Sequence, residues 1–185
     1  MNTNPGSQII GDWPKESREA AKLVIEKYGE PDEATPTQLV WHGRSKWKRI
    51  VATKAFYAHD FPYPHFDSVQ GVIDYKVPPE KLSDLGRFDG SVIVDRTPGE
   101  VSARCHDEEA NNLALNLMHD IVSGSKDVGA ARTYYAKEFA DYRRKLPTPY
   151  MEQLKVPIAE NAADPDTAIL SDEDIDAAKK EGEAK

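Results

Sequence analysis

The chain has 185 residues, 39% of them hydrophobic and 30% charged, which is enough for one globular domain. No apolar run approaches the ~20 residues that a membrane-spanning helix needs, so we expect no membrane partner. The first residues have neither the basic nor the apolar segment of a secretory signal, and the single cysteine, Cys105, has no partner for an internal disulfide. Both features predict a cytoplasmic protein.

The formal net charge of −8 is concentrated near the C-terminus. Residues 160–185 contain nine Asp or Glu and three Lys, a net charge of −6, which leaves −2 for the rest of the chain. A nearly neutral body lacks the broad positive field of a dedicated nucleic-acid-binding protein. We therefore do not expect nucleic acid as a partner.

The N-terminal segment predicts a flexible leader followed by a helix. Residues 1–11 form the expected leader, and residues 12–29 form the expected helix. Pro14 suits the first helical turn, where its missing N–H is no loss, and Gly29 can end the helix in a left-handed conformation. Apolar residues recur between these ends at helical spacing.

The middle of the chain predicts mainly extended structure, because β-branched and aromatic residues alternate with turn residues. The expected strands are residues 38–42, 47–57 and 70–77, and the two arms of a hairpin over 90–105. A short helix is expected over 78–86, opened by proline and closed by glycine.

The following segment predicts two helices, over residues 107–124 and 127–146. Acidic residues begin each helix, Gly124 ends the first, and basic residues before Pro147 end the second, as the helix dipole favours. Residues 147–185 contain several prolines and then many charges, so we expect an arm followed by an acidic, largely disordered tail.

The order of these elements favours an α+β fold. Strands come in adjacent pairs with helices before and after them, rather than in alternation with helices. We expect a single domain, residues 12–146, in which helices pack on one face of an antiparallel sheet of about five strands.

The segment HDFPYPHFD, residues 59–67, is the first candidate site. Two prolines restrict the backbone and make a stiff loop, which would hold the polar side chains in nearly set positions. His59, His65 and Asp67 could bind a divalent transition metal, although their spacing matches no specific metal motif. In the alternative interpretation, the loop is structural and its aromatic residues fill gaps in the core; a proton-transfer role for one histidine is a third.

A polar stripe on the expected helix 107–124 is the second candidate site. Glu109, Asn112, Asn116 and His119 recur at helical spacing beside an apolar face. If the stripe is buried, its polar groups must be hydrogen-bonded, since an unpaired group costs about 1–3 kcal/mol. The stripe could therefore bond to loop backbone and fix the fold, or it could floor a ligand pocket.

Cys105 falls where a strand is expected to end and a helix to begin. A helix N-terminus and the neighbouring Arg104 would both lower the thiol pKa. A reactive, redox-sensing thiolate is one interpretation, and a buried inert cysteine is the other. If the strand ends lie together, His59, His65, Cys105 and Glu109 would line one cleft.

The segment WHGRSKWKR, residues 41–49, combines basic and aromatic residues, which can grip phosphates and stack bases. One hairpin on a nearly neutral body is a weak footprint, so we favour core tryptophans and solvated basic residues. No glycine-rich nucleotide-binding motif and no nucleophile elbow is present.

Several segments together give a family resemblance: YGEPDEATP, LVWH, HDFPYPH, IDYKVP, RTPGEVSARC and LALNL followed by HDIV. The combination resembles a family of small bacterial proteins of uncharacterised activity, over about residues 12–146. The resemblance implies a bacterial, single-domain protein and assigns no functional residue.

Two hypotheses follow from the sequence, and they leave open whether the protein is an enzyme. In the first, the protein binds a metal or a small ligand through His59, His65 and Asp67, facing the polar helix stripe. In the second, it is a non-catalytic interaction module that uses residues 147–185 to bind a protein partner or a second copy of itself.

Overall fold

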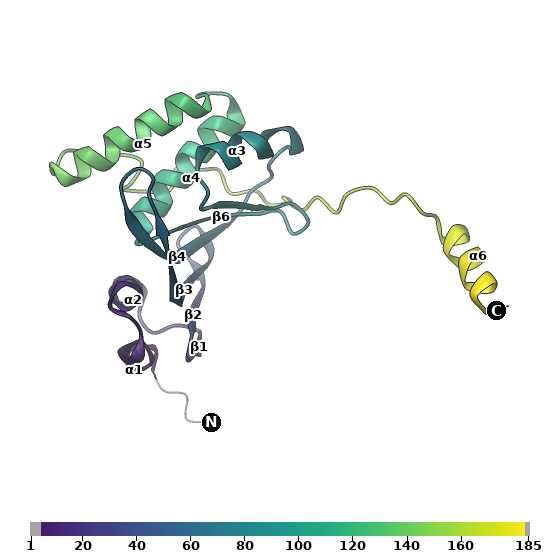
Figure 1. The fold of residues 1–185 in the computed structure, drawn as a ribbon, viewed down its shortest axis with the longest axis horizontal. Coiled ribbons are helices and arrows are strands. Elements are labelled where there is room, and N and C mark those ends of the chain that lie inside the picture. The colour runs from purple at the N-terminus through teal and green to yellow at the C-terminus, as the bar shows by residue number, and fades with distance from the viewer. Residues whose placement is uncertain (1–4, 184–185) are drawn as a thin grey trace.

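The computed structural model describes residues 5–183 and shows one antiparallel sheet with helices (Figure 1). The six strands follow the order β1-β2-β3-β4-β6-β5. Their bounds are β1 (Glu33–Thr35), β2 (Gln38–Arg44), β3 (Trp47–His59), β4 (His65–Asp74), β5 (Val92–Asp95) and β6 (Glu100–Cys105). The predicted α+β class is confirmed, and the strand that the sequence missed is the three-residue edge strand β1.

The helices precede and follow the strands, as predicted. They are α1 (Gly6–Ile9), α2 (Lys15–Tyr28), α3 (Leu82–Phe88), α4 (Glu108–Ser123), α5 (Val128–Arg143) and α6 (Asp172–Glu183), with short 3₁₀ turns η1 (Ile10–Asp12) and η2 (Pro79–Lys81). Pro14 precedes α2 and Gly29 ends it with φ +80°, and Asp107 caps α4 by accepting a hydrogen bond from the Ala110 amide. The predicted ends of these two helices are confirmed to within three residues.

One face of the sheet forms the core with α2 and α4. Side chains alternate between faces along a strand, so positions paired across the sheet share a face. The pairs Trp41–Ile50 and Gly71–Ala103 lie on the covered face. Buried residues of both helices join the same cluster: Ala20, Ala21, Val24, Leu113, Leu117 and Ile121.

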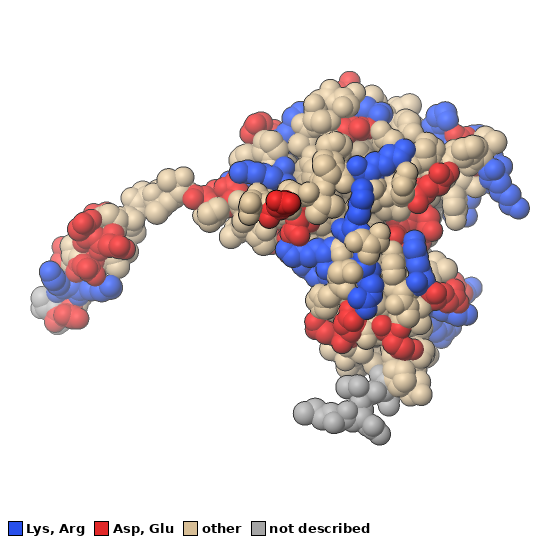
Figure 2. Space-filling model, turned by 180° about the vertical axis from the view of Figure 1, so that it is seen from behind, with Lys and Arg blue, Asp and Glu red and all other residues tan. Residues whose placement is uncertain are grey.

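The hairpin β2–β3 carries its tryptophans into this core. Trp41 and Trp47 are buried, whereas Lys48 and Arg49 form ion pairs with Glu100. The tryptophans of the hairpin therefore belong to the core, and ion pairs neutralise the charges of Lys48 and Arg49. Figure 2 shows basic and acidic side chains interspersed over one face of the body.

Residues 1–4 of the expected leader lie outside the described residues, and the rest of the leader forms α1 and η1. Ile10 is buried and belongs to the core cluster. Within the described part of the chain, no helix has the length and apolar content of a membrane span.

The C-terminal arm packs on the domain before the chain leaves it. Met151 and Val156 are buried in the core cluster, so the packed unit extends past the expected boundary at residue 146. Gly99 has φ +71°, and a Cβ there would lie 2.1 Å from the backbone of Ala162. Only glycine allows this close approach. Beyond the arm, α6 projects away from the body with no buried residue (Figure 1); residues 184–185 are outside the described range.

Candidate metal centre

The strands β3 and β4 extend to the two histidines of the candidate site. His59 and His65 are directly paired as the last and first residues of the two strands, and Tyr57 pairs with Asp67. The expected loop over 59–67 is thus wrong in its bounds: only residues 60–64 connect the strands, because backbone pairing continues through both histidines. A cis bond between Phe61 and Pro62 lies in this connection.

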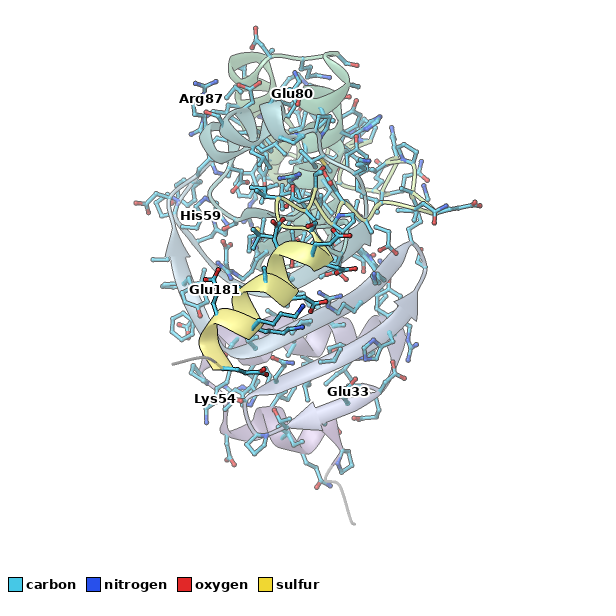
Figure 3. The ribbon with its side chains drawn as sticks, turned by 90° about the vertical axis from the view of Figure 1, so that its right-hand side faces the viewer. Glu33, Lys54, His59, Glu80, Arg87 and Glu181 are labelled. Carbon is cyan, nitrogen blue, oxygen red and sulfur yellow. The ribbon has the colours of Figure 1, made fainter. Side chains whose placement is uncertain are left out.

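Strand alternation then places the ligand atoms together. His65 and Asp67 are two residues apart on β4 and share one face. The His65 Nε2 atom lies 3.0 Å from Asp67 Oδ1, and the His59 Nδ1 atom lies 3.1 Å from Asp67 Oδ2. One ligand atom from each of the three residues lies within 4.8 Å of the ligand atoms of the other two. Figure 3 shows His59 in the upper part of the sheet, on the side of the helical layer marked by Arg87, far from Glu33 of β1.

Asp67 is the most buried member of this group, with 1% of its surface exposed. The Ser91 hydroxyl donates a hydrogen bond to Asp67 Oδ2, whereas Oδ1 accepts no hydrogen bond of good geometry. A buried carboxylate oxygen without a donor is costly, so its presence calls for a specific partner.

The tautomer of His65 sharpens this point. Its Nδ1 lies 2.8 Å from the Tyr63 carbonyl oxygen, which can only accept, so Nδ1 carries a proton. In the neutral ring, the Nε2 lone pair therefore faces the Oδ1 lone pairs of Asp67 at 3.0 Å. Two lone pairs at this distance repel one another unless a cation lies between them, either a proton on Nε2 or a metal ion.

Without a metal, the proton is the cation that pairs these groups. Burial lowers the pKa of His65, but the hydrogen bond with Asp67 and the one with the Tyr63 carbonyl outweigh it, so the net pKa is raised. Burial likewise raises the pKa of Asp67, and hydrogen bonds from His65 and Ser91 reverse this to a net lowering. The two directions agree and describe an imidazolium–carboxylate ion pair.

Asp89 adds a second buried carboxylate behind His59, whose Nε2 lies 3.6 Å from Asp89 Oδ1. Burial raises the pKa of Asp89, although a hydrogen bond from the Ser91 amide opposes the rise. Such a carboxylate can orient a metal-binding imidazole through the nitrogen that does not bind the ion.

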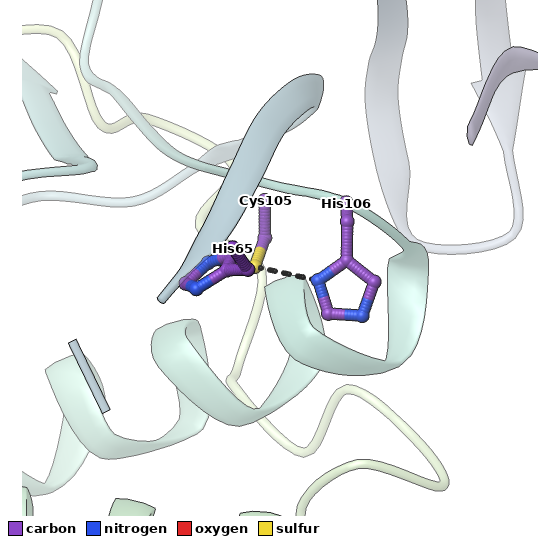
Figure 4. A group of neighbouring side chains, drawn as sticks. All are labelled: His65, Cys105 and His106. Carbon is purple, nitrogen blue, oxygen red and sulfur yellow. Dashed lines mark hydrogen bonds between the residues drawn. The ribbon is translucent and has the colours of Figure 1, made fainter. Parts of the chain in front are cut away.

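Cys105 and His106 lie beside His65 (Figure 4). Cys105 ends β6 and pairs with Val69 of β4, which puts its thiol on the face of His65. The Sγ atom lies 3.2 Å from His65 Nε2 and 3.4 Å from His106 Nδ1. Asp107 accepts from His106 Nε2 at 2.8 Å and leaves the Nδ1 lone pair directed at the thiol. These three residues form a second group with metal-ligand spacing that shares His65 with the first.

The expected lowering of the thiol pKa is wrong. Burial raises the pKa of Cys105 well above its usual value, and the carboxylates of Asp67 and Asp107 raise it further. Arg104 lies on the other face of β6, with its guanidinium 4.6 Å from the centroid of the Tyr57 ring. The free thiol is therefore protonated at neutral pH, as the inert-cysteine interpretation expects.

The polar stripe of α4 contacts the C-terminal arm. Asn112 donates to the Met151 carbonyl oxygen, and Asn116 donates to the carbonyls of Tyr150 and Gln153 while accepting from the Lys155 amide. For Asn112 and Asn116, the structure confirms the interpretation that the stripe bonds to loop backbone.

The other two stripe residues also lie apart from the histidine cluster. His119 pairs with the Tyr75 hydroxyl at 2.7 Å, and Glu109 lines a shallow cavity beside α2. Of the residues expected in one cleft, His59, His65 and Cys105 therefore come together and Glu109 does not.

A groove runs beside the connection between β3 and β4. Pro62 and Tyr63 line one side, and Phe139, Ala140 and Arg143 of α5 line the other, enclosing about 710 Å³. The aromatic residues of the connection differ in their burial. Phe61 packs on Tyr135, whereas Tyr63 is 66% exposed. The structural interpretation therefore holds for Phe61 alone.

The sequence did not indicate Ser91 or Asp89 as part of the site, and it did not predict the contact between His106 and the thiol. The dipeptides around Ser91 indicate only turns, and the contact of Ser91 with Asp67 arises from long-range pairing of β5, β6 and β4. His106 reaches Cys105 because the chain turns there into α4. No local signal in the sequence reports such contacts.

Comparisons with known protein families, with curated proteins and with solved structures find no match to this chain. The resemblance to a small bacterial family stays a prediction, and the geometry of the site carries the functional argument.

Proposed function

We propose that the protein binds a divalent transition-metal ion through His59, His65 and Asp67. The observation that carries the proposal is Asp67 Oδ1, which is buried, accepts no hydrogen bond of good geometry and lies 3.0 Å from His65 Nε2. A metal ion at this position would satisfy both groups at once. The strands fix all three residues, so the ligands need little rearrangement.

The donor set favours zinc among the common ions. Two imidazoles and one carboxylate suit zinc and its neighbours, whereas magnesium and calcium prefer sites made only of oxygen. Three protein ligands leave one position of a tetrahedral zinc site to be filled.

Metal content measured by inductively coupled plasma mass spectrometry on untagged protein tests the proposal, together with a zinc titration. We expect one zinc per chain in the wild type and none in the His59→Ala/His65→Ala variant. The chain offers a matched control, His42→Ala/His119→Ala, which removes two histidines outside the site and should keep the zinc. Wild-type protein that binds no transition metal would rule the proposal out, provided its fold is intact.

The exposed C-terminal segment supports a second candidate function, a protein-interaction module. Ile169 is 97% exposed and Leu170 is 62% exposed, next to an acidic helix with no buried residue. The packed arm makes deletion from residue 147 unsuitable as a test, because Met151 belongs to the core. Deleting residues 167–185 should abolish association with a partner or a second copy while the fold stays intact; unchanged association would reject this candidate. A cytoplasmic location, bacterial origin and the identity of any partner stay predictions.

A further inference from the structure

We propose that the Cys105 thiolate is a fourth ligand of the same ion, which makes the centre a mixed nitrogen, oxygen and sulfur site. This inference rests on the proposed function and deepens it by naming the class of metal. The geometry at His65 is the starting point, because Asp67 Oδ1 and Cys105 Sγ lie 3.0 and 3.2 Å from the same Nε2 atom.

These separations fit the edges of a coordination tetrahedron. Ligand atoms about 2.0–2.3 Å from a tetrahedral metal ion lie roughly 3.3–3.7 Å from one another. The observed distances are a few tenths of an ångström shorter, so a small outward shift of each side chain would admit the ion. His59 Nδ1 lies 3.1 Å from the other oxygen of Asp67. Metal-ligand spacing is found for His59, His65 and Asp67 and for His65, Cys105 and His106, so one ion held by the first group and Cys105 requires a further movement of His59 or Cys105.

Two independent features point to a ligand rather than to a packed cysteine. The first is the buried Asp67 Oδ1 atom, which accepts no hydrogen bond of good geometry. The second is the arrangement around the thiol, where the nitrogens of His65 and His106 lie 3.2 and 3.4 Å from Sγ. A cysteine that only fills space does not need imidazole nitrogens on both sides.

Metal binding also resolves the protonation state of the thiol. Coordination to a divalent ion deprotonates a thiol outright, even where burial disfavours the free thiolate. On binding, the S–H bond breaks, the sulfur–metal bond forms and the proton leaves to solvent. The positive ion then lies beside the Asp67 carboxylate, whose negative charge favours it.

A thiolate ligand predicts metal selectivity. Soft sulfur donors favour zinc over manganese and magnesium, which prefer oxygen. We expect the wild-type protein to prefer zinc to manganese by a larger factor than Cys105→Ser does. The serine variant should also bind zinc at least about 100-fold more weakly, since it loses one of four ligands.

Cobalt(II) absorption spectroscopy gives the direct test, because cobalt occupies zinc sites and thiolate ligation produces a charge-transfer band in the near ultraviolet. Cys105 is the only cysteine in the chain, so any such band must come from it. We expect the band in the wild type and in the control His42→Ala, and its loss in Cys105→Ser and Cys105→Ala.

The visible bands of bound cobalt separate the two proposals. Visible cobalt bands without a near-ultraviolet thiolate band would overturn the role of Cys105 and leave the His59, His65 and Asp67 site standing. No visible bands at all, in folded protein with cobalt in excess, would overturn both proposals. Because alanine and serine at position 105 differ in polarity, a fold defect in one variant leaves the other as the test.

Discussion

The polar face of α4 and the histidine end of the sheet carry the same kinds of side chain but differ in how their hydrogen bonds are satisfied. On α4, Asn116 bonds to two carbonyl oxygens and one amide of the arm. At the end of β4, Asp67 Oδ1 is equally buried and accepts no hydrogen bond. The first region holds the fold together, and the second places a buried carboxylate oxygen 3.0 Å from an imidazole nitrogen without a hydrogen bond of good geometry.

This difference shows that burial of polar groups alone does not mark a functional site. Both regions produce a polar pattern in the sequence, and both are covered in the structure. On α4, the Asn116 side-chain oxygen accepts from a backbone amide, whereas Asn112 Oδ1, like Asp67 Oδ1, accepts no hydrogen bond. What separates the two regions is the charge of the Asp67 carboxylate and the imidazole nitrogen of His65, which lies 3.0 Å from its Oδ1 atom.

Replacing His65 by alanine should have the largest effect on metal binding. His65 Nε2 is the nitrogen nearest to both Asp67 and Cys105, so its loss removes the centre of the ligand set. We expect the zinc affinity to fall by at least about 1,000-fold, which corresponds to about 4 kcal/mol. Isothermal titration calorimetry measures the change, and an affinity within tenfold of the wild type would contradict the assignment. His119→Ala is the matched control with unchanged affinity.

Replacing Asn116 by alanine should act on stability instead. The variant leaves two carbonyl oxygens and one amide of the arm without their partner, so the free energy of unfolding should fall by about 2–4 kcal/mol. Urea denaturation measures this loss. Asn161→Ala, at an exposed position of the arm, should change the stability by less than about 0.5 kcal/mol. A stable Asn116→Ala protein that had lost zinc binding would reverse the roles of the two regions.

The zinc affinity should depend on pH through His65. Its pKa is raised in the metal-free protein, so below that pKa zinc must displace a proton from Nε2. We expect the affinity to fall about tenfold for each pH unit below the raised pKa, in addition to the effect of the other ligands. Titrations between pH 5.5 and 7.5 measure the slope, and an affinity independent of pH would contradict the ion-pair description.

The same ion pair should affect the stability of the metal-free protein. A raised His65 pKa contributes stability that is present below the unfolded value of about 6.5 and is lost as the pH rises through the folded value. A lowered Asp67 pKa contributes stability that is present above about 3.8 and is lost as the pH falls through the folded value. The pair therefore stabilises metal-free protein most between these limits, which His65→Ala should abolish in urea denaturation.

The smallest effect is expected on the face of the sheet away from α4. Glu100 is paired with Arg49, which lowers its pKa to about 2 despite some burial. Its contribution to stability is present above about pH 4.5 and is lost as the pH falls toward 2. We expect Glu100→Gln to destabilise the protein by about 1–2 kcal/mol at pH 7, after allowance for the 34% exposure of Arg49, without affecting zinc binding. Glu80→Gln, at an exposed position, serves as the control.

Local signals in the sequence predict most of the fold. Pro14 and Gly29 mark the ends of α2, and Asp107 and Gly124 mark the ends of α4, because the geometry of helix ends restricts the residue types there. The edge strand β1 escapes prediction because three residues carry no alternating pattern. Burial of Met151 escapes because a single apolar residue in a proline-containing arm gives no periodic signal.

The candidate site is predictable only in part, for the same reason. His59, His65 and Asp67 lie within nine residues, so sequence proximity brings them to notice. The contacts with Ser91, Cys105 and the ring of His106 depend on which strands lie side by side, and this order is a property of the whole sheet. Because residues 59–67 were expected to form a loop, the sequence did not predict the pairing of β3 with β4 that sets the positions of the two imidazoles.

Thermal unfolding with and without zinc tests the distinction between the two regions most directly, in wild-type protein, Asn116→Ala and His65→Ala. A ligand that binds only the folded state stabilises it by about 2.7 kcal/mol at a concentration 100 times its dissociation constant. We predict that zinc raises the melting temperature of wild type and of Asn116→Ala and leaves that of His65→Ala unchanged. A zinc-induced rise in His65→Ala equal to that of the wild type would contradict the account, because the ion would then bind elsewhere on the chain.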